Sequence, residues 1–236
     1  MPELPANFRD FHVRSSKLIV GTDMATSASV PIDYVRARRL LARRDPVLRE
    51  LMRVHGPCRL AARQHADPFK ALTRAIVGQQ LSAKAAATIF SRFEALFEAF
   101  PTPAQVCAVP DDRLRGVGLS SQKVGYLRDL CRRILDGELP LDVLDRMDDE
   151  AVVETLMQVK GIGRWTAEMF LIFRLQRPDV LPLGDLGIVT AVRRAYKLRK
   201  APSADRLTRI GEAWRPYRSV ACWYLWASLN NEPTKD

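Results

Sequence analysis

The chain has 236 residues, 47% of them hydrophobic, which is enough for one sizeable domain or two small lobes with packed cores. Lysine and arginine outnumber aspartate and glutamate by 37 to 27, which gives a net charge of +10. A positive charge of this size favours polyanionic partners, nucleic acid first. Solvated, arginine-rich helix faces would explain the same charge equally well. No apolar run approaches the roughly 20 residues that cross a bilayer, and the four cysteines lie too far apart for a metal-binding spacing, so we expect reduced thiols and a cytoplasmic protein without membrane contact.

The first 30 residues show no sustained period, and we predict an N-terminal extension in which "SKLIV" (16–20) is the one candidate strand. Helical spacing of apolar residues then predicts helices over 34–56, broken near Pro46, and over 68–97, interrupted around Gly78 with Ser82 as an N-cap. Further helical segments are expected at 110–137, 148–175, 186–198 and 204–229. Because no long stretch alternates with period two, the predicted fold is all-α.

Two of these segments contain a G-x-G turn between helices, at Gly116 and Gly118 and again at Gly161 and Gly163. Glycine accepts a positive φ and allows close backbone approach, so the following helix can present bare N–H groups to an anion such as a DNA phosphate. An ordinary helix end followed by a helix start would leave the same pattern.

Three segments in order carry a family resemblance: "RAIVGQQLSAKAAATIFSRF" (74–93), "VKGIGRWTAEMF" (159–170) with Asp185 twenty residues after Trp165, and "EAWRPYRSVACWYLW" (212–226). Over about 33–229 the sequence resembles the helix-hairpin-helix (HhH-GPD) DNA glycosylases. Within that superfamily it is most similar to the DNA-3-methyladenine glycosylase II type, in a short form without the N-terminal mixed domain. The resemblance implies two helical lobes flanking a DNA-binding cleft, with the hairpin at its lip.

The domain organisation that follows is an extension at 1–30, a glycosylase domain at 31–231 and a tail at 232–236. We expect one lobe to comprise 69–185 and the other to combine 31–68 with 186–231.

The resemblance identifies Asp185 as the catalytic carboxylate, which would stabilise positive charge at C1′ of a flipped nucleotide. Asp185 also precedes a predicted helix, where aspartate is often only an N-cap, and the two roles are compatible. The competing carboxylate, Asp179 beside Pro178, is interpreted as a turn residue.

Relatives with lyase activity carry a lysine two residues after the second hairpin glycine, where this chain has Trp165, so we predict a monofunctional hydrolase. An iron–sulfur cluster is not expected, because Cys222 is the only cysteine near the C-terminus. No other cofactor and no side-chain metal site are predicted, although the resemblance makes a cation at the hairpin carbonyls plausible.

The resemblance implies a base pocket formed by Trp165, Met169, Leu186 and Trp226, in which aromatic rings would stack on a cationic alkylated purine. Met169 replaces an aromatic residue of the long bacterial form. Tryptophans in amphipathic helices usually pack inside the core, and this alternative stays open for both Trp165 and Trp226.

The resemblance also implies contacts with the DNA duplex. Gln80 or Leu81 would act as the wedge that fills the space of the flipped base, unless the interruption is a simple helix–helix turn. The expected backbone contacts are Gly161, Gly163 and Arg164, with a second set at Gly116, Gly118 and Lys123, which packing between helices would explain equally well.

These observations predict a monomeric DNA glycosylase of base excision repair that removes alkylated purines of the 3-methyladenine type from double-stranded DNA. One alternative is a glycosylase for a deaminated or oxidised base, because specificity depends on the pocket. The other is a non-catalytic hairpin module, for which a carboxylate facing phosphates would bring no benefit.

Overall fold

The computed structural model describes residues 32–61 and 67–229. Within these ranges every regular element is helical, which confirms the predicted all-α fold. None of the described helices combines the length and the apolarity needed to span a bilayer. The predicted extension, the candidate strand at 16–20 and the tail at 232–236 lie outside the described residues.

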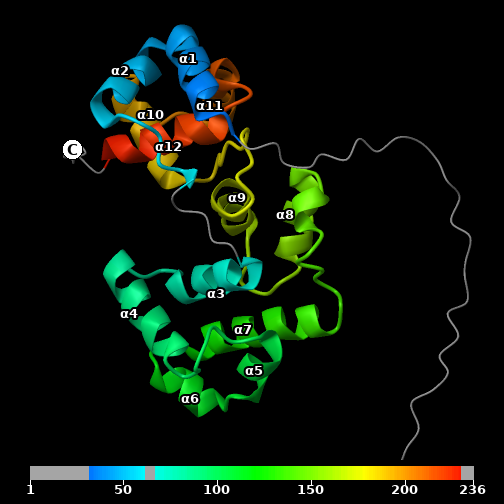
Figure 1. Cartoon of the computed structure of the whole chain (residues 1–236). Helices are drawn as coiled ribbons and strands as arrows, with labels where there is room; N and C mark the ends of the chain where they lie inside the picture. Colours follow the sequence, from blue (N-terminus) through cyan, green and yellow to red (C-terminus); the bar gives the residue numbers. More distant parts are fainter. Residues whose placement is uncertain (1–31, 62–66, 230–236) are drawn as a thin grey trace, which may run out of the picture.

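The helices follow one another along the chain in the order shown in Figure 1. They are α1 (Tyr34–Arg44), α2 (Pro46–His55), α3 (Pro68–Gly78), α4 (Ala83–Glu94), α5 (Pro103–Ala108), α6 (Asp111–Gly116), α7 (Ser121–Leu135), η2 (Leu144–Arg146), α8 (Asp149–Met157), α9 (Arg164–Phe173), α10 (Leu186–Ala195), α11 (Ala204–Gly211), η3 (Glu212–Trp214) and α12 (Arg218–Leu229).

The helices form two groups, which Figure 1 shows above and below one another. In the first group, α2 and α10 pack on α12, and α1 contacts α2, α12 and η3. In the second, α3 packs on α4 and α7, and α5 and α6 pack on α7. Helix α9 pairs with α8 and also contacts α3. The chain therefore starts in one group, builds the other and returns through the segment between α9 and α10.

Asp45 ends α1 and begins α2, as the proline at position 46 predicts. Its carboxylate accepts hydrogen bonds from the amides of Val47 and Leu48, and also from Tyr196 and from Trp214 Nε1 at 2.9 Å. Asp45 is buried, so these donors replace the water that the carboxylate loses. One capping residue thus ties α2 to the end of α10 and to η3.

The interruption predicted at Gly78 is confirmed, because α3 ends there and α4 begins at Ala83 with Ser82 as its N-cap. The segment 204–229 is divided into α11, η3 and α12 around Pro216, whose nitrogen carries no hydrogen for a continuous helix. The short helix α5 was not predicted; six residues are too few for a clear period.

Candidate active site

Asp185 is the N-cap of α10, and its carboxylate is almost completely buried, with 6% of the residue exposed. Oδ1 accepts hydrogen bonds from the Ile188 amide at 2.7 Å and from Trp226 Nε1 at 3.0 Å, while Oδ2 accepts one from Trp165 Nε1 at 2.6 Å. All three partners are donors, which suits an ionised carboxylate that can only accept. Capping and a fixed orientation of the charge are therefore combined in one residue.

Gly187 leaves the space that this arrangement requires. A Cβ atom there would lie 2.9 Å from Asp185 Oδ1 and 3.2 Å from Trp226 Cδ1, closer than side chains normally pack. The φ of Gly187 is not positive, so the importance of this glycine is steric: it leaves room for the Asp185 carboxylate and the Trp226 ring to meet.

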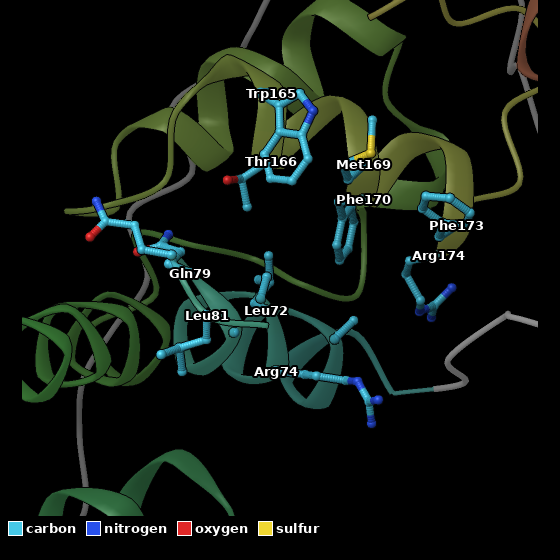
Figure 2. Close-up of a pocket in the computed structure, with 14 residues that line it drawn as sticks. Leu72, Arg74, Gln79, Leu81, Trp165, Thr166, Met169, Phe170, Phe173 and Arg174 are labelled. Atoms are coloured by element: carbon cyan, nitrogen blue, oxygen red, sulfur yellow. The ribbon is translucent and has the colours of Figure 1, made fainter. Parts of the chain in front are cut away.

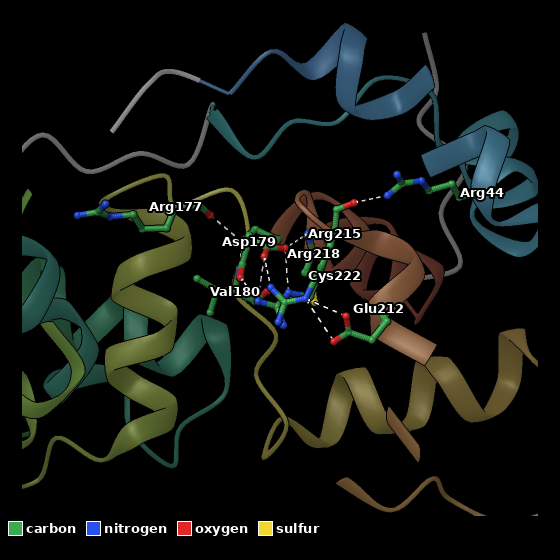
Figure 3. Close-up of polar contacts among 9 residues, drawn as sticks. Arg44, Arg177, Asp179, Val180, Glu212, Arg215, Arg218 and Cys222 are labelled. Atoms are coloured by element: carbon green, nitrogen blue, oxygen red, sulfur yellow. Dashed lines mark hydrogen bonds and ion pairs between the residues drawn. The ribbon is translucent and has the colours of Figure 1, made fainter. Parts of the chain in front are cut away.

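The segment before Asp185 is fixed to the start of α12 by a polar network (Figure 3). Asp179 forms ion pairs with Arg218 at 2.8 Å and with Arg215 at 2.9 Å. Ser219 Oγ donates to the Arg177 carbonyl at 2.6 Å and accepts from the Val180 amide at 3.0 Å. Asp179 is thus occupied in anchoring the chain, whereas Asp185 faces the two indoles.

A cavity of about 530 Å³ lies between α3 and α9 (Figure 2). Its lining is mostly apolar and comprises Ala71, Leu72, Arg74, Ala75, Gly78, Gln79, Gln80, Leu81, Trp165, Thr166, Met169, Phe170, Phe173 and Arg174. Gln79 and Leu81 lie at one end, and Arg74 and Arg174 at the other. The volume falls in the range of small-molecule sites.

Of the four predicted pocket residues, Trp165 and Met169 line this cavity. Trp226 does not line it. Its ring packs against Phe173, 5.7 Å between centroids, so it stands behind the wall and contacts Asp185 instead. Leu186 does not line it either and is 81% exposed, because it follows the inward-turned N-cap at the first position of α10.

Trp165 connects the cavity to the carboxylate. One part of its side chain lines the cavity, its Nε1 binds Asp185, and 49% of the residue is exposed. Asp185 itself is not part of the lining, so it is separated from the cavity by one indole ring.

The hairpin between α8 and α9 turns at Gly161, which has φ +83°, and α9 begins after Gly163 without a capping side chain. A Cβ atom at Gly161 would lie 2.2 Å from the ring of Tyr126, whereas one at Gly163 would meet nothing within 4 Å. Arg164 is exposed and pairs with Glu150. The amides of the first turn of α9 thus open towards solvent beside the cavity, as a phosphate site requires.

Two of the hairpin carbonyls already accept hydrogen bonds. The Val159 carbonyl accepts from the Ile162 amide at 3.0 Å, and the Gly161 carbonyl accepts from Gln79 Nε2 at 2.7 Å. The cation that the family resemblance implies at this turn stays a prediction.

At the second G-x-G turn, one residue follows the packing alternative. Gly116 ends α6 and Gly118, with φ +106°, packs against Ile89; both glycines are exposed. Lys123 binds within the protein, because two of its three Nζ–H groups donate to the carbonyls of Val77 and Gln79 at 2.7 and 2.8 Å. The end of α3 points its unpaired carbonyls at α7, and a lysine at that place satisfies them.

Gln80 and Leu81, the wedge candidates, project from the turn after α3. Gln80 is exposed and adopts a left-handed backbone, φ +57°, which is uncommon outside glycine, and 38% of Leu81 is exposed. Both also line the cavity, so the wedge candidates and the predicted base pocket adjoin one another.

Sequence reasoning missed two residues of α7 that support the hairpin. The ring of Tyr126 lies against Gly161, and the buried carboxylate of Asp129 accepts from the Lys160 amide at 2.9 Å and pairs with Arg133 at 3.0 Å. Burial opposes ionisation of Asp129, but these hydrogen bonds outweigh it and the pKa of Asp129 is lowered. Their spacing from Lys123, three residues at each step, was the available signal, because it puts all three on one face of a helix.

The two glycines of the hairpin are expected to respond differently to alanine. Gly161→Ala should lower the free energy of unfolding by about 2 kcal/mol or more, because it combines a positive φ with a clash against Tyr126. Gly163→Ala should cost less than about 1 kcal/mol, the difference between glycine and alanine at an N-cap, yet weaken duplex binding about tenfold by crowding the phosphate. Thermal melting and fluorescence anisotropy with labelled duplex DNA measure the two effects. Equal melting temperatures for the two variants would contradict the steric difference.

Comparison with known proteins identifies the family of the chain. Residues 73–216 match the family model described as HhH-GPD superfamily base excision DNA repair protein. DNA-3-methyladenine glycosylase 1 of Schizosaccharomyces pombe is 38% identical over 68% of this chain and 72% of its own length.

Solved structures agree with these sequence matches. The 3-methyladenine DNA glycosylase of S. pombe in complex with abasic DNA superposes with a TM-score of 0.76 at 33% identity, covering 85% of this chain and 100% of that one. A DNA-3-methyladenine glycosidase from Bacillus halodurans gives 0.74 at 36% identity, covering 83% and 89%. The all-α arrangement, the glycine hairpin and these similarities together show that this chain belongs to the HhH-GPD superfamily of base excision DNA repair proteins.

Proposed function

We propose that the protein is a monofunctional DNA glycosylase that turns alkylated purines out of double-stranded DNA and hydrolyses their N-glycosidic bond, leaving an abasic site. The observation that carries this proposal is the buried Asp185 carboxylate, held by two indole N–H groups and one amide beside the cavity and the hairpin. The names of relatives that are 3-methyladenine glycosylases, one of them solved with abasic DNA, support it.

The lesion base would enter the cavity between α3 and α9. Purines alkylated at N3 or N7 carry a positive charge, which an aromatic face attracts by about 0.5–2 kcal/mol. Trp165 offers such a face, and Met169 adds a polarisable sulfur along the same wall. Arg74 and Arg174 at the far end would oppose a cation there, so the base would be held nearer Trp165.

Bond cleavage would need little acid–base assistance. As the N-glycosidic bond breaks, its electron pair goes to the cationic base, which leaves neutral, and positive charge develops on the sugar. The ionised Asp185 would stabilise that charge electrostatically. The oxygen of water then bonds to C1′, and the water loses one proton, which gives the abasic sugar.

DNA binding would be shared among three features. The amides at the start of α9 accept a phosphate, the +10 charge attracts the duplex, and Gln80 or Leu81 enters the stack in place of the extruded base. Extrusion costs a few kcal/mol, and it costs least for a weakly paired, damaged base.

We also propose that the protein acts as a monomer, in the cellular compartment that holds the chromosome.

The proposal is tested by incubating methylated duplex DNA with the protein and identifying the released base by chromatography. We expect 3-methyladenine from the wild type, and a rate at least about 100-fold lower from Asp185→Asn with unchanged duplex affinity, because the charge but not the shape is removed. Release of only deaminated or oxidised bases from a lesion panel would reassign the substrate. No release from any lesion would favour a binding module.

Sodium borohydride tests the monofunctional assignment. Trp165 occupies the position at which a lysine would attack C1′, so no protein–DNA Schiff base should form and borohydride should trap no covalent complex during turnover. A trapped complex would require an amine nucleophile, and peptide mapping would identify it.

Gly187→Ala tests the position of the carboxylate. Alanine favours a helix over glycine by up to about 1 kcal/mol, but crowding a buried site costs about 1–3 kcal/mol, so the melting temperature should fall by a few degrees at most. The added Cβ would displace the Asp185 carboxylate or Trp226, and we expect about 10- to 100-fold slower base release, as for small misplacements of catalytic groups. Unchanged single-turnover rates would show that the position of the carboxylate is not critical.

A further inference from the structure

The wedge loop, residues 78–82 between α3 and α4, contains an uncommon backbone conformation. Gln80 at its centre has φ +57° and an exposed side chain. The loop supports this conformation with its own turn, in which the Leu81 amide donates to the Gly78 carbonyl at 3.3 Å, and non-glycine residues with a left-handed backbone often occur at functional sites. Two side chains fix this turn to the rest of the protein.

Lys123 on α7 supplies the first contact. Its ammonium group donates to the Val77 carbonyl, in the last turn of α3, and to the Gln79 carbonyl, just beyond it, at 2.7 and 2.8 Å. The lysine is half-buried, and burial lowers the pKa of its ammonium group. A charged donor therefore closes the end of α3 immediately before Gln80, at the place where the chain leaves the helix.

Gln79 supplies the second contact. Its side-chain Nε2 donates to the Gly161 carbonyl at 2.7 Å, so the wedge loop is joined directly to the phosphate-binding hairpin. Gly161 in turn lies against Tyr126, and Asp129 holds the neighbouring Lys160 amide.

Helix α7 thus contacts both DNA-binding elements along one face. Lys123 holds the wedge loop, while Tyr126 and Asp129 hold the hairpin, three residues apart at each step. The sequence left two roles open for Lys123, a DNA contact or packing between helices, and the structure shows two of its N–H groups bound within the protein.

We propose that Lys123 and Gln79 are positioning residues that lock the wedge loop to the hairpin, so that gripping the phosphate and opening the base stack occur as one movement. This role rests on the proposed glycosylase function. It requires that the two residues matter for extruding the base and much less for cleaving the bond of a base that is already free to leave the stack.

Two duplexes separate these steps. In the first, the same alkylated purine is paired with its normal partner; in the second, it lies opposite an abasic-site analogue, which removes most of the cost of extrusion but keeps the backbone for the hairpin. Single-turnover base release is measured on both duplexes for the wild type, Lys123→Met and the matched control Lys84→Met. Lys84 is an exposed lysine on the neighbouring helix α4, so the control removes the same charge.

Lys123→Met should slow release from the paired duplex about tenfold or more, the effect expected when a charged donor leaves two carbonyls. On the unpaired duplex the loss should be less than about threefold, roughly what a small residual change in positioning would cause. Lys84→Met should change both rates by the same factor. Gln79→Met, which removes the donor to the Gly161 carbonyl but keeps a side chain of similar size in the cavity lining, is checked by thermal melting and should repeat the pattern if Lys123→Met fails to fold.

Equal losses on both duplexes would show that Lys123 and Gln79 serve general stability, and unchanged rates would show that the loop needs no lock. Either result would overturn the positioning role while the wild type stays active. A wild type that released no base from either duplex would instead overturn the proposed function, and this role with it.

Discussion

The Asp185 carboxylate, with a hydrogen-bond donor from each of three directions, is the contact on which the rest of the site depends. Trp165 comes from α9 beside the hairpin, Trp226 from α12, and the Ile188 amide from α10. The bond between Trp165 and Asp185 therefore joins the two groups of helices. Moving a charged group out of water costs several kcal/mol. Hydrogen bonds to the charged group offset this cost, because each contributes about 1.5–3 kcal/mol. The carboxylate and the spacing of the helix groups thus stabilise one another.

A small number of side chains also positions the DNA-binding elements. The hairpin presents amides because Gly163 provides no cap, and it stays in place because Tyr126 and Asp129 support its turn from α7. The wedge loop is tied to that turn by Gln79. Cavity, wedge and hairpin are consequently positioned by a few side chains of α3, α7 and α9, and the half-exposed Trp165 stands where all of them meet.

Local patterns were enough to predict the features that local physics controls. The proline after Asp45, the cap at Ser82 and the hairpin glycines each have a backbone consequence that does not depend on distant residues. The predicted N-cap role of Asp185 is confirmed, because it caps α10, while its catalytic role stays a prediction. The break between α11 and α12 was not predicted, because the apolar spacing continues from α11 across Pro216 into α12.

What the sequence could not provide was the direction of side chains that meet residues far along the chain. Lysine often binds phosphate, but the hydrogen-bond partners of Lys123 are backbone carbonyls that lie 44 and 46 residues earlier in the chain. Trp226 matches a family pocket position, but the ring of Phe173 stands between it and the cavity.

The position of the Asp185 carboxylate is tested most directly by a crystal structure with duplex DNA that contains a cationic pyrrolidine analogue of the abasic sugar. We expect an Asp185 oxygen within about 3.5 Å of the cationic ring nitrogen. An analogue bound in the site with no Asp185 oxygen near the ring, and with another charged group or none beside it, would contradict the proposed role of Asp185.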